Sequence, residues 1–171
     1  MLGLPYPGGP SISTAGAEGN SNAFTFPLPL HKEKTLDFSF SGLKTSLRYT
    51  LRDRGHSWQH LIGDLAASYE HALCAHLCDR LTQALKQHPE IRELHLVGGV
   101  SANTRLRAMV TACAPHVTVR FPATLSYCTD NAAMIGAAAQ FLCDESGDAA
   151  FADFETIASL PLASAVMALP E

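Results

Sequence analysis

Apolar residues recur every four positions through one long stretch of the chain. Such spacing places them on one face of an amphipathic helix. The pattern predicts a helix that is capped by Ser57, runs to about Gln87 and ends before Pro89. The apolar positions are Leu61, Leu65, Tyr69, Leu73, Leu77, Leu81 and Leu85.

Shorter stretches alternate between apolar and polar residues, which is typical of strands. Predicted strands cover residues 36–40, 93–97 and 117–121. Predicted helices cover 41–54, 101–113 and 130–143, and Thr129 is the expected cap of the last. Alternation of strand and helix in the second half indicates an α/β domain whose sheet is at least partly parallel.

Proline and glycine crowd the beginning of the chain. Residues 1–30 contain five of each, a density typical of turns and loops. The sequence therefore predicts a loop-rich region at 1–35, an α/β lobe at 36–143 and an acidic tail at 144–171. With 171 residues, of which 47% are hydrophobic and 16% charged, the chain has a globular composition. This composition excludes a disordered or a collagen-like protein.

Charge is distributed unevenly along the chain. The net charge is −4, yet six acidic residues and no Lys or Arg follow residue 143, so the lobe is slightly basic. One predicted helix face carries Lys44, Arg48 and Arg52 at a spacing of four, which is either a solvated face or a contact for phosphates.

Cysteine usage and hydropathy bear on the compartment. The five cysteines form no CxxC pair, and no apolar run approaches the roughly 20 residues that span a bilayer. We expect free thiols, most of them buried, in a cytoplasmic protein without a membrane segment.

A hydrophobic strand runs directly into Gly98-Gly99, and a helix follows. Glycine lets the backbone approach a ligand closely, and a helix N-terminus offers free N–H groups to an anion. Asn103, expected in the first helical turn, can bond a sugar or phosphate oxygen. This segment is either a phosphate-type site or a plain tight turn, because it lacks the complete GxGxxG and Walker patterns.

Two other patterns suggest metal ligands. Asp130 is predicted in the first turn of a helix, where a carboxylate either binds a ligand or stabilises the helix dipole. His56 and His60, as well as His71, Cys74 and Cys78, have helical spacing that can hold a metal. For these last two sets, surface histidines and buried thiols are the favoured interpretation.

Five ordered blocks together closely resemble the TsaD family, the tRNA N6-adenosine threonylcarbamoyltransferases. The blocks are GLPYPGGP (3–10), DFSFSGLKT (37–45), DLAASYEHAL (64–73), LVGGVSANTRLR (96–107) and CTDNAAMI (128–135). The resemblance implies an RNase H-like lobe of the actin-like ATPase (ASKHA) superfamily. It also implies transfer of a threonylcarbamoyl group from threonylcarbamoyl-adenylate to N6 of adenosine 37 in tRNAs that read ANN codons.

The resemblance also assigns residues and partners. Gly9, Gly98, Gly99 and Asn103 would contact the adenylate, while Asp130 would be one ligand of a divalent metal, iron or zinc. The tRNA and the proteins TsaB and TsaE are the implied partners. We expect Asn103 and Asp130 to point into one pocket.

The family's N-terminal half, which carries the other metal ligands, has no counterpart here. We therefore expect an incomplete lobe that is inactive alone. The alternative is a non-catalytic, TsaB-like interaction module of the same complex. A sugar- or acetate-kinase-like phosphotransferase would bring phosphate motifs of its own, and an endopeptidase has no HExxH or GxSxG motif to support it.

Overall fold

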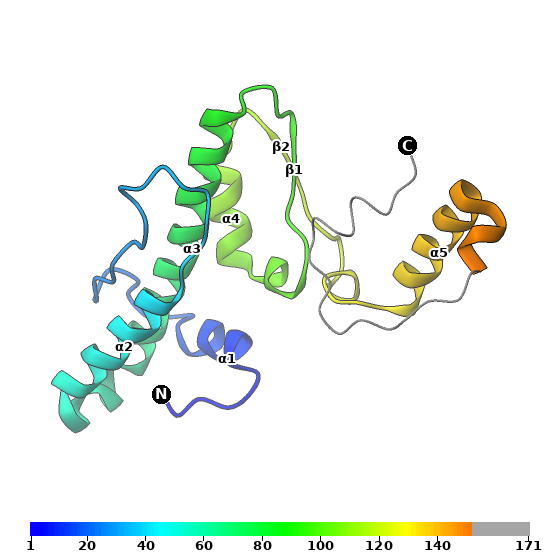
Figure 1. Ribbon diagram of the computed structural model, residues 1–171. Coiled ribbons are helices and arrows are strands. Elements are labelled where there is room, and N and C mark those ends of the chain that lie inside the picture. The colour runs from blue at the N-terminus through cyan, green and yellow to red at the C-terminus, as the bar shows by residue number, and fades with distance from the viewer. Residues whose placement is uncertain (152–171) are drawn as a thin grey trace. The chain divides into compact units, whose positions relative to one another are not determined.

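The computed structural model describes residues 1–151, which fall into two compact units with a division after Thr129. In the first unit the helices are α1 (Gly8–Ala15), α2 (Ser41–Asp53), α3 (Ile62–Gln87) and α4 (Thr104–Cys113), and the strands are β1 (Glu93–His95) and β2 (Thr118–Arg120) (Figure 1). Three short 3-10 helices cover Gly55–Leu61, Gly99–Ala102 and Leu125–Tyr127. The second unit contains α5 (Ala132–Ser146) and a 3-10 turn, Gly147–Phe151.

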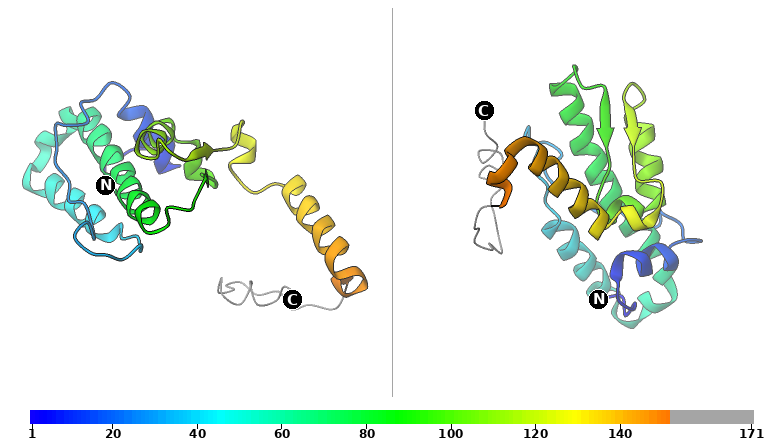
Figure 2. Two further views of the ribbon diagram at one scale, coloured as in Figure 1. Left: turned by 90° about the horizontal axis from the view of Figure 1, so that it is seen from above. Right: turned by 90° about the vertical axis from the view of Figure 1, so that its right-hand side faces the viewer.

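The two strands form a small parallel sheet, which confirms the predicted α/β arrangement. Leu94 pairs with Val119, and α4 connects the strands as a crossover helix. Figure 2 shows the strands running beside α3 and α4. Leu94 and Val119 pack toward these helices, whereas Glu93 and Arg120 lie on the exposed face and form an ion pair.

The long helix α3 organises the first unit because it packs against several other elements. Near its N-terminus Leu65 and Tyr69 join Leu43 and Leu47 of α2 in one apolar cluster. A second cluster, farther along, is made by Cys74, Cys78, Leu106 and Val110, and so joins α3 to α4. A helix of 26 residues is about 39 Å long, which allows it to serve two separate clusters.

Buried thiols contribute to the second cluster, as the sequence predicts. All five cysteines are free, and Cys74, Cys78 and Cys128 are buried. Burial raises the pKa of Cys74 to about 11 and that of Cys78 to about 12. These thiols therefore stay protonated and pack as small apolar groups.

Glycine allows α1 to lie directly against α3. A Cβ added to Gly16 would lie 2.6 Å from the backbone nitrogen of Ala67, and one added to Gly19 would overlap the Gly63 carbonyl group. The N-terminal stretch predicted to be loops thus contains a helix that is fixed to α3 by close backbone contact. That contact places Gly9 and Ser13, both on α1, near Asn103 at the start of α4.

Two predicted elements differ from the structure in the segment before α3. Residues 36–40 form no strand, and the Ser39 N–H donates to Nε2 of His76 on α3 instead of to a neighbouring strand. The long helix begins at Ile62 rather than after Ser57, since residues 55–61 form a 3-10 helix and the Ser57 hydroxyl donates to the Arg54 carbonyl. The predicted end at Gln87 is correct.

Helix caps also differ from the predictions. Asn103 and Asn131 are the N-caps of α4 and α5, and their side chains accept from the Leu106 and Met134 N–H groups at 2.8 and 3.1 Å. Asp130 therefore precedes its helix instead of lying in the first turn. Helix α5 continues past residue 143, where the sequence predicts the lobe to end.

The structure describes only part of the predicted acidic tail. Asp153, Glu155 and Glu171 lie outside the described residues. No helix within residues 1–151 combines the length and apolar character needed to cross a bilayer.

Candidate functional site

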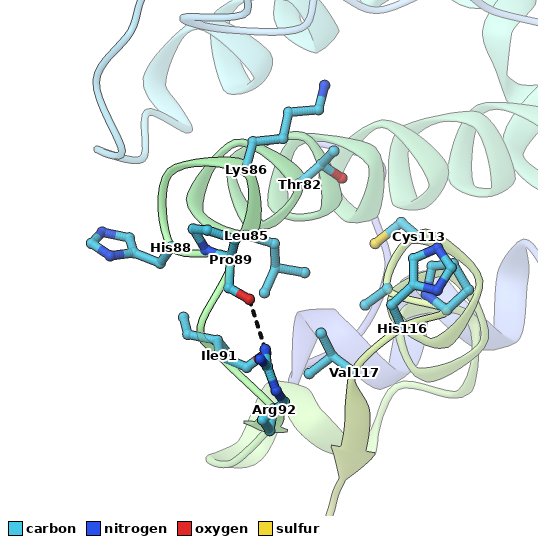
Figure 3. Close-up of a pocket in the computed structure, with 12 residues that line it drawn as sticks. Thr82, Leu85, Lys86, His88, Pro89, Ile91, Arg92, Cys113, His116 and Val117 are labelled. Carbon is cyan, nitrogen blue, oxygen red and sulfur yellow. Dashed lines mark hydrogen bonds between the residues drawn. The ribbon is translucent and has the colours of Figure 1, made fainter.

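Two cavities of the first unit flank the small sheet at different ends. The cavity in Figure 3, about 340 Å³, is lined by residues that directly precede the strands, among them Ile91, Arg92 and Val117. Of its two cationic side chains, Lys86 and Arg92, the latter donates from Nη1 to the Pro89 carbonyl at 2.7 Å. Ligands of α/β sheets bind beyond the carboxyl ends of parallel strands, and this cavity is at the amino ends.

The other cavity lies beyond the carboxyl end of β1 and measures about 480 Å³. It brings together α1, the glycine turn and the start of α4, which are far apart in sequence. Three of the residues that the sequence singles out, Gly9, Gly99 and Asn103, line it. The other lining residues are Pro10, Ser13, Thr14, Val100, Ala102, Thr104 and Leu125. We call this space the α1–α4 cavity and treat it as the candidate site.

The glycine turn has a backbone that side chains would disturb. Gly98 adopts φ 83° and ψ 170°, a region occupied almost only by glycine. Gly99 begins the 3-10 helix that follows, and a Cβ placed there would meet only the Thr129 methyl group, at 3.8 Å. The turn thus leaves the backbone open toward the cavity.

Gly9 forms part of the opposite wall. It belongs to the first turn of α1, and no atom lies within 4 Å of a Cβ built on it. Its lack of a side chain is therefore not required for packing within the described unit. Instead, the absence of a side chain at Gly9 keeps the α1–α4 cavity open.

The Asn103 side chain is held from three directions. Its Nδ2 donates to Oε1 of Glu70 at 2.7 Å and to Oγ of Ser13 at 3.2 Å, and its Oδ1 accepts from the Leu106 N–H. Both amide hydrogens are thereby used within the protein. What remains for a ligand is one acceptor site on Oδ1, which suits a hydroxyl or N–H group and not a phosphate oxygen.

The Glu70 carboxylate is the negatively charged group to which Ser13 and Asn103 are bonded. Its side chain is 9% exposed and accepts from Ser13 and Asn103, while Oε2 accepts from Nε of Arg105 at 3.0 Å. Burial acts to raise the pKa of Glu70, but the hydrogen bonds from Ser13, Asn103 and Arg105 outweigh it and hold that pKa below its ordinary value. Glu70 is therefore a carboxylate at neutral pH.

Glu70 and Arg105 are not among the residues predicted for the site, and Ser13 is not assigned a role there. A signal for Glu70 exists, since it is the single Asp, Glu, Lys or Arg in AASYEHALCA, residues 66–75, most of which are small or apolar. An acid in such a run requires a buried partner. The sequence does not show that the partners come from residues 13, 103 and 105.

Asp130 belongs to the second unit, so its predicted place in the same pocket as Asn103 stays a prediction. Within residues 1–151 no group of three or more His, Cys, Asp and Glu side chains is arranged to hold a metal. The described residues therefore do not fit a complete metal site. At most, Asp130 can supply one ligand of a site completed by other residues.

The fold and the cavity define an α/β protein with a candidate ligand site beyond the carboxyl end of its parallel strands. Comparison with protein families then identifies it more closely. Residues 1–137 match the family model TsaD, described as tRNA N6-adenosine threonylcarbamoyltransferase. The chain belongs to this family, as its sequence blocks predict.

Curated relatives carry the same name, tRNA N6-adenosine threonylcarbamoyltransferase. The chain is 39% identical over 164 residues to the protein from a Nitratiruptor species, which covers 94% of this chain and 48% of the relative. It is 43% identical over 143 residues to the Rhizobium etli protein, covering 79% and 39% respectively. A Fervidobacterium nodosum protein is 42% identical over 142 residues. The chain thus spans about half the length of these relatives or less.

Proposed function

We propose that the chain supplies the C-terminal part of a tRNA N6-adenosine threonylcarbamoyltransferase. In this reaction the threonylcarbamoyl group passes from threonylcarbamoyl-adenylate to N6 of adenosine 37 in tRNAs reading ANN codons. The observation that carries the proposal is the α1–α4 cavity, where Gly9, Gly99 and Asn103 meet although up to 94 positions separate them in sequence. We further propose that the α/β unit is part of an RNase H-like, ASKHA-type lobe.

The chemistry explains what this cavity must provide. Adenosine N6 attacks the carbamoyl carbon, a C–N bond forms, and the C–O bond to the phosphate breaks. AMP leaves with the electron pair, and N6 loses a proton. Holding the adenylate in place while N6 approaches is mainly a problem of positioning. In this proposal the open backbone at Gly9 and Gly99 admits the ligand, and Oδ1 of Asn103 accepts from one of its hydroxyl groups.

The exposed apolar side chains of Val100 and Leu125, which also line the cavity, suit one face of a purine ring. The implied metal remains a proposal limited to Asp130 as a single ligand, with iron or zinc as the candidates. The described residues lack the other donors that such a site needs.

A chimaera tests the transferase directly. The N-terminal half of the Nitratiruptor relative is placed before Met1, and the product is expressed in a bacterial host depleted of its own enzyme. We expect threonylcarbamoyl-adenosine to reappear in total tRNA, as measured by mass spectrometry of nucleosides. A soluble, folded chimaera that yields none, in a host where the intact relative succeeds, would reject the proposed function.

Gly9→Val in this chimaera should lower the modification at least about tenfold, because the new side chain projects into the cavity without meeting protein atoms of the described unit. Gly8→Val is the matched control, since Gly8 is equally open but does not line the cavity. Equal modification by both variants would contradict the assignment of the cavity.

The basic face of α2 is our proposed tRNA contact. Lys44, Arg48 and Arg52 are all exposed in the described unit. Replacing all three by alanine should weaken tRNA binding by the chimaera and reduce the slope of log K against log salt by about one per lost phosphate contact. Arg120→Ala is the control, because it removes an exposed cation that lies on β2 and not on the basic face of α2. An unchanged slope in the triple variant would show that this face of α2 is solvated and does not contact the tRNA phosphates.

TsaB and TsaE remain the proposed protein partners. Co-purification of each with the tagged chimaera, compared with the tagged 171-residue chain, tests this assignment. The competing non-catalytic role predicts complex formation without any tRNA modification.

A further inference from the structure

The carboxylate of Glu70 joins three elements that enclose the α1–α4 cavity. Glu70 itself belongs to α3 and does not line the cavity. Its Oε1 accepts from Ser13 on α1 and from Asn103 at the cap of α4, and Oε2 accepts from Arg105 in the first turn of α4. One buried side chain thus connects the Gly9 wall to the Asn103 wall.

This connection determines which atom Asn103 shows to a ligand. An amide next to a carboxylate directs its NH₂ group toward the negative charge, so the oxygen turns away from Glu70. The Leu106 N–H, at 2.8 Å from Oδ1, fixes the same orientation from the other side. Without Glu70 the NH₂ group loses its strongest acceptor, and only the bonds to Leu106 and Ser13 are left to orient the amide.

Folding alone does not account for a carboxylate at this position. A buried charge costs free energy unless it is paired, and apolar replacements of buried ion pairs are often as stable as the pair. Arg105 supplies one partner for the charge, but the other oxygen is directed to two residues that line the cavity. The Glu70 carboxylate therefore orders residues of the cavity in addition to its pairing with Arg105.

We propose that Glu70 is a positioning residue, which fixes the Asn103 amide and holds the Ser13 and Asn103 walls of the α1–α4 cavity together. The biochemical consequence, tighter adenylate binding, rests on the proposed function. Glu70 acts through Asn103 and touches neither the ligand nor the reacting atoms.

Three variants separate this role from a purely structural one. Glu70→Gln keeps an acceptor at the position of Oε1 but loses the charge that pairs with Arg105. Glu70→Asp keeps the charge but is shorter by one methylene, so it cannot reach Arg105 and both cavity residues together. Glu70→Ala removes both features. Glu93→Ala, at an exposed ion pair on the sheet, is the control.

The measurement is made on the 171-residue chain by NMR, with AMP as the probe and thermal unfolding recorded in parallel. We expect the Asn103 side-chain amide signals to be slowly exchanging in the unmutated chain and in Glu70→Gln, and fast in Glu70→Asp and Glu70→Ala. Affinity for AMP should fall at least about tenfold in the last two and less than about threefold in Glu70→Gln. Thermal stability should instead depend on the charge at residue 70, so we expect Glu70→Gln to be less stable than the unmutated chain.

Two outcomes are decisive. Unchanged Asn103 signals and unchanged AMP affinity in Glu70→Asp would overturn the proposal, and this variant remains informative where Glu70→Ala does not fold. If AMP shifts no signal of Gly9 or Gly99 in the unmutated chain while the Asn103 amide still responds to Glu70, the positioning role holds and the adenylate site is rejected.

Discussion

Gly19→Ala is expected to lower the free energy of unfolding of the chain by about 3 kcal/mol, at the upper end of the range for overpacked sites. The Cβ would overlap the Gly63 carbonyl group and lie 3.0 Å from Cβ of Ala67. Backbone atoms cannot rotate away as a side chain can. The strain must therefore separate α1 from α3, which also displaces the cavity wall that carries Gly9.

Urea unfolding of the chain measures this effect, and AMP titration by NMR reports the loss of the cavity wall. Gly42→Ala is the matched control, because Gly42 lies in α2 with nothing within 4 Å of its added Cβ and should gain up to about 1 kcal/mol from higher helix propensity. If Gly19→Ala proves as stable as Gly42→Ala, the close contact between α1 and α3 is refuted.

Local sequence signals predicted the part of the site that is continuous in the chain. The strand before Gly98-Gly99 is present, although it ends at His95 and not at residue 97, and Asn103 lies at the start of the helix that follows. These features depend on glycine backbone freedom and on capping, both of which act within a few residues. Even here the sequence predicts Asn103 within the first helical turn, whereas the structure places it at the N-cap.

Contacts between distant segments were not predictable in the same way. Gly9 was assigned by family resemblance alone, and the helix that carries it lies in a stretch whose proline and glycine content indicates loops. Its stability comes from contact with α3, not from local propensity. Likewise, the hydrogen bond between Ser13 and Glu70 joins residues 57 positions apart, and no spacing rule connects them.

Residues 36–40 show how tertiary contacts override a local pattern. The alternation of Leu36, Phe38 and Phe40 with polar residues is a strand signal, yet the two phenylalanines flank His76 edge-on at 6.0 and 5.2 Å between ring centres. The backbone between them is bonded to the same histidine. Side chains of α3 thus take the place of a neighbouring strand.

Arg80, also on α3, holds residues 30–35 through bonds from its side chain to their backbone. We expect its replacement to have a large effect as well. The guanidinium is fully buried and donates to the carbonyl groups of Leu30, Glu33 and Thr35 at 2.8, 3.3 and 2.6 Å, and to Asp79. Arg80→Met removes all of these bonds together from a buried site. Removing one partner of a buried charged network costs about 3–5 kcal/mol, and we expect a loss in this range.

The segment depends on Arg80 because its own backbone is strained. Leu30 adopts φ 55°, a conformation that costs a residue with a side chain about 1–2 kcal/mol. Such a conformation persists only where surrounding contacts impose it, and the bond from Arg80 to the Leu30 carbonyl is one of these. Arg80→Met should therefore also expose the Glu33 N–H, which bonds to the Leu30 carbonyl, to rapid hydrogen exchange.

Arg80→Lys separates charge from geometry, because an ammonium group retains the charge but lacks the planar fork that reaches several carbonyl groups together. We expect an intermediate loss of stability in urea unfolding. Arg52→Met, at an exposed pair with Asp53, should change stability by less than about 1 kcal/mol. If Arg80→Met and Arg52→Met have equal effects, the carbonyl contacts of Arg80 do not hold residues 30–35, and the path of the chain between α1 and α2 must be fixed by the apolar contacts of Phe24 and Phe26 instead.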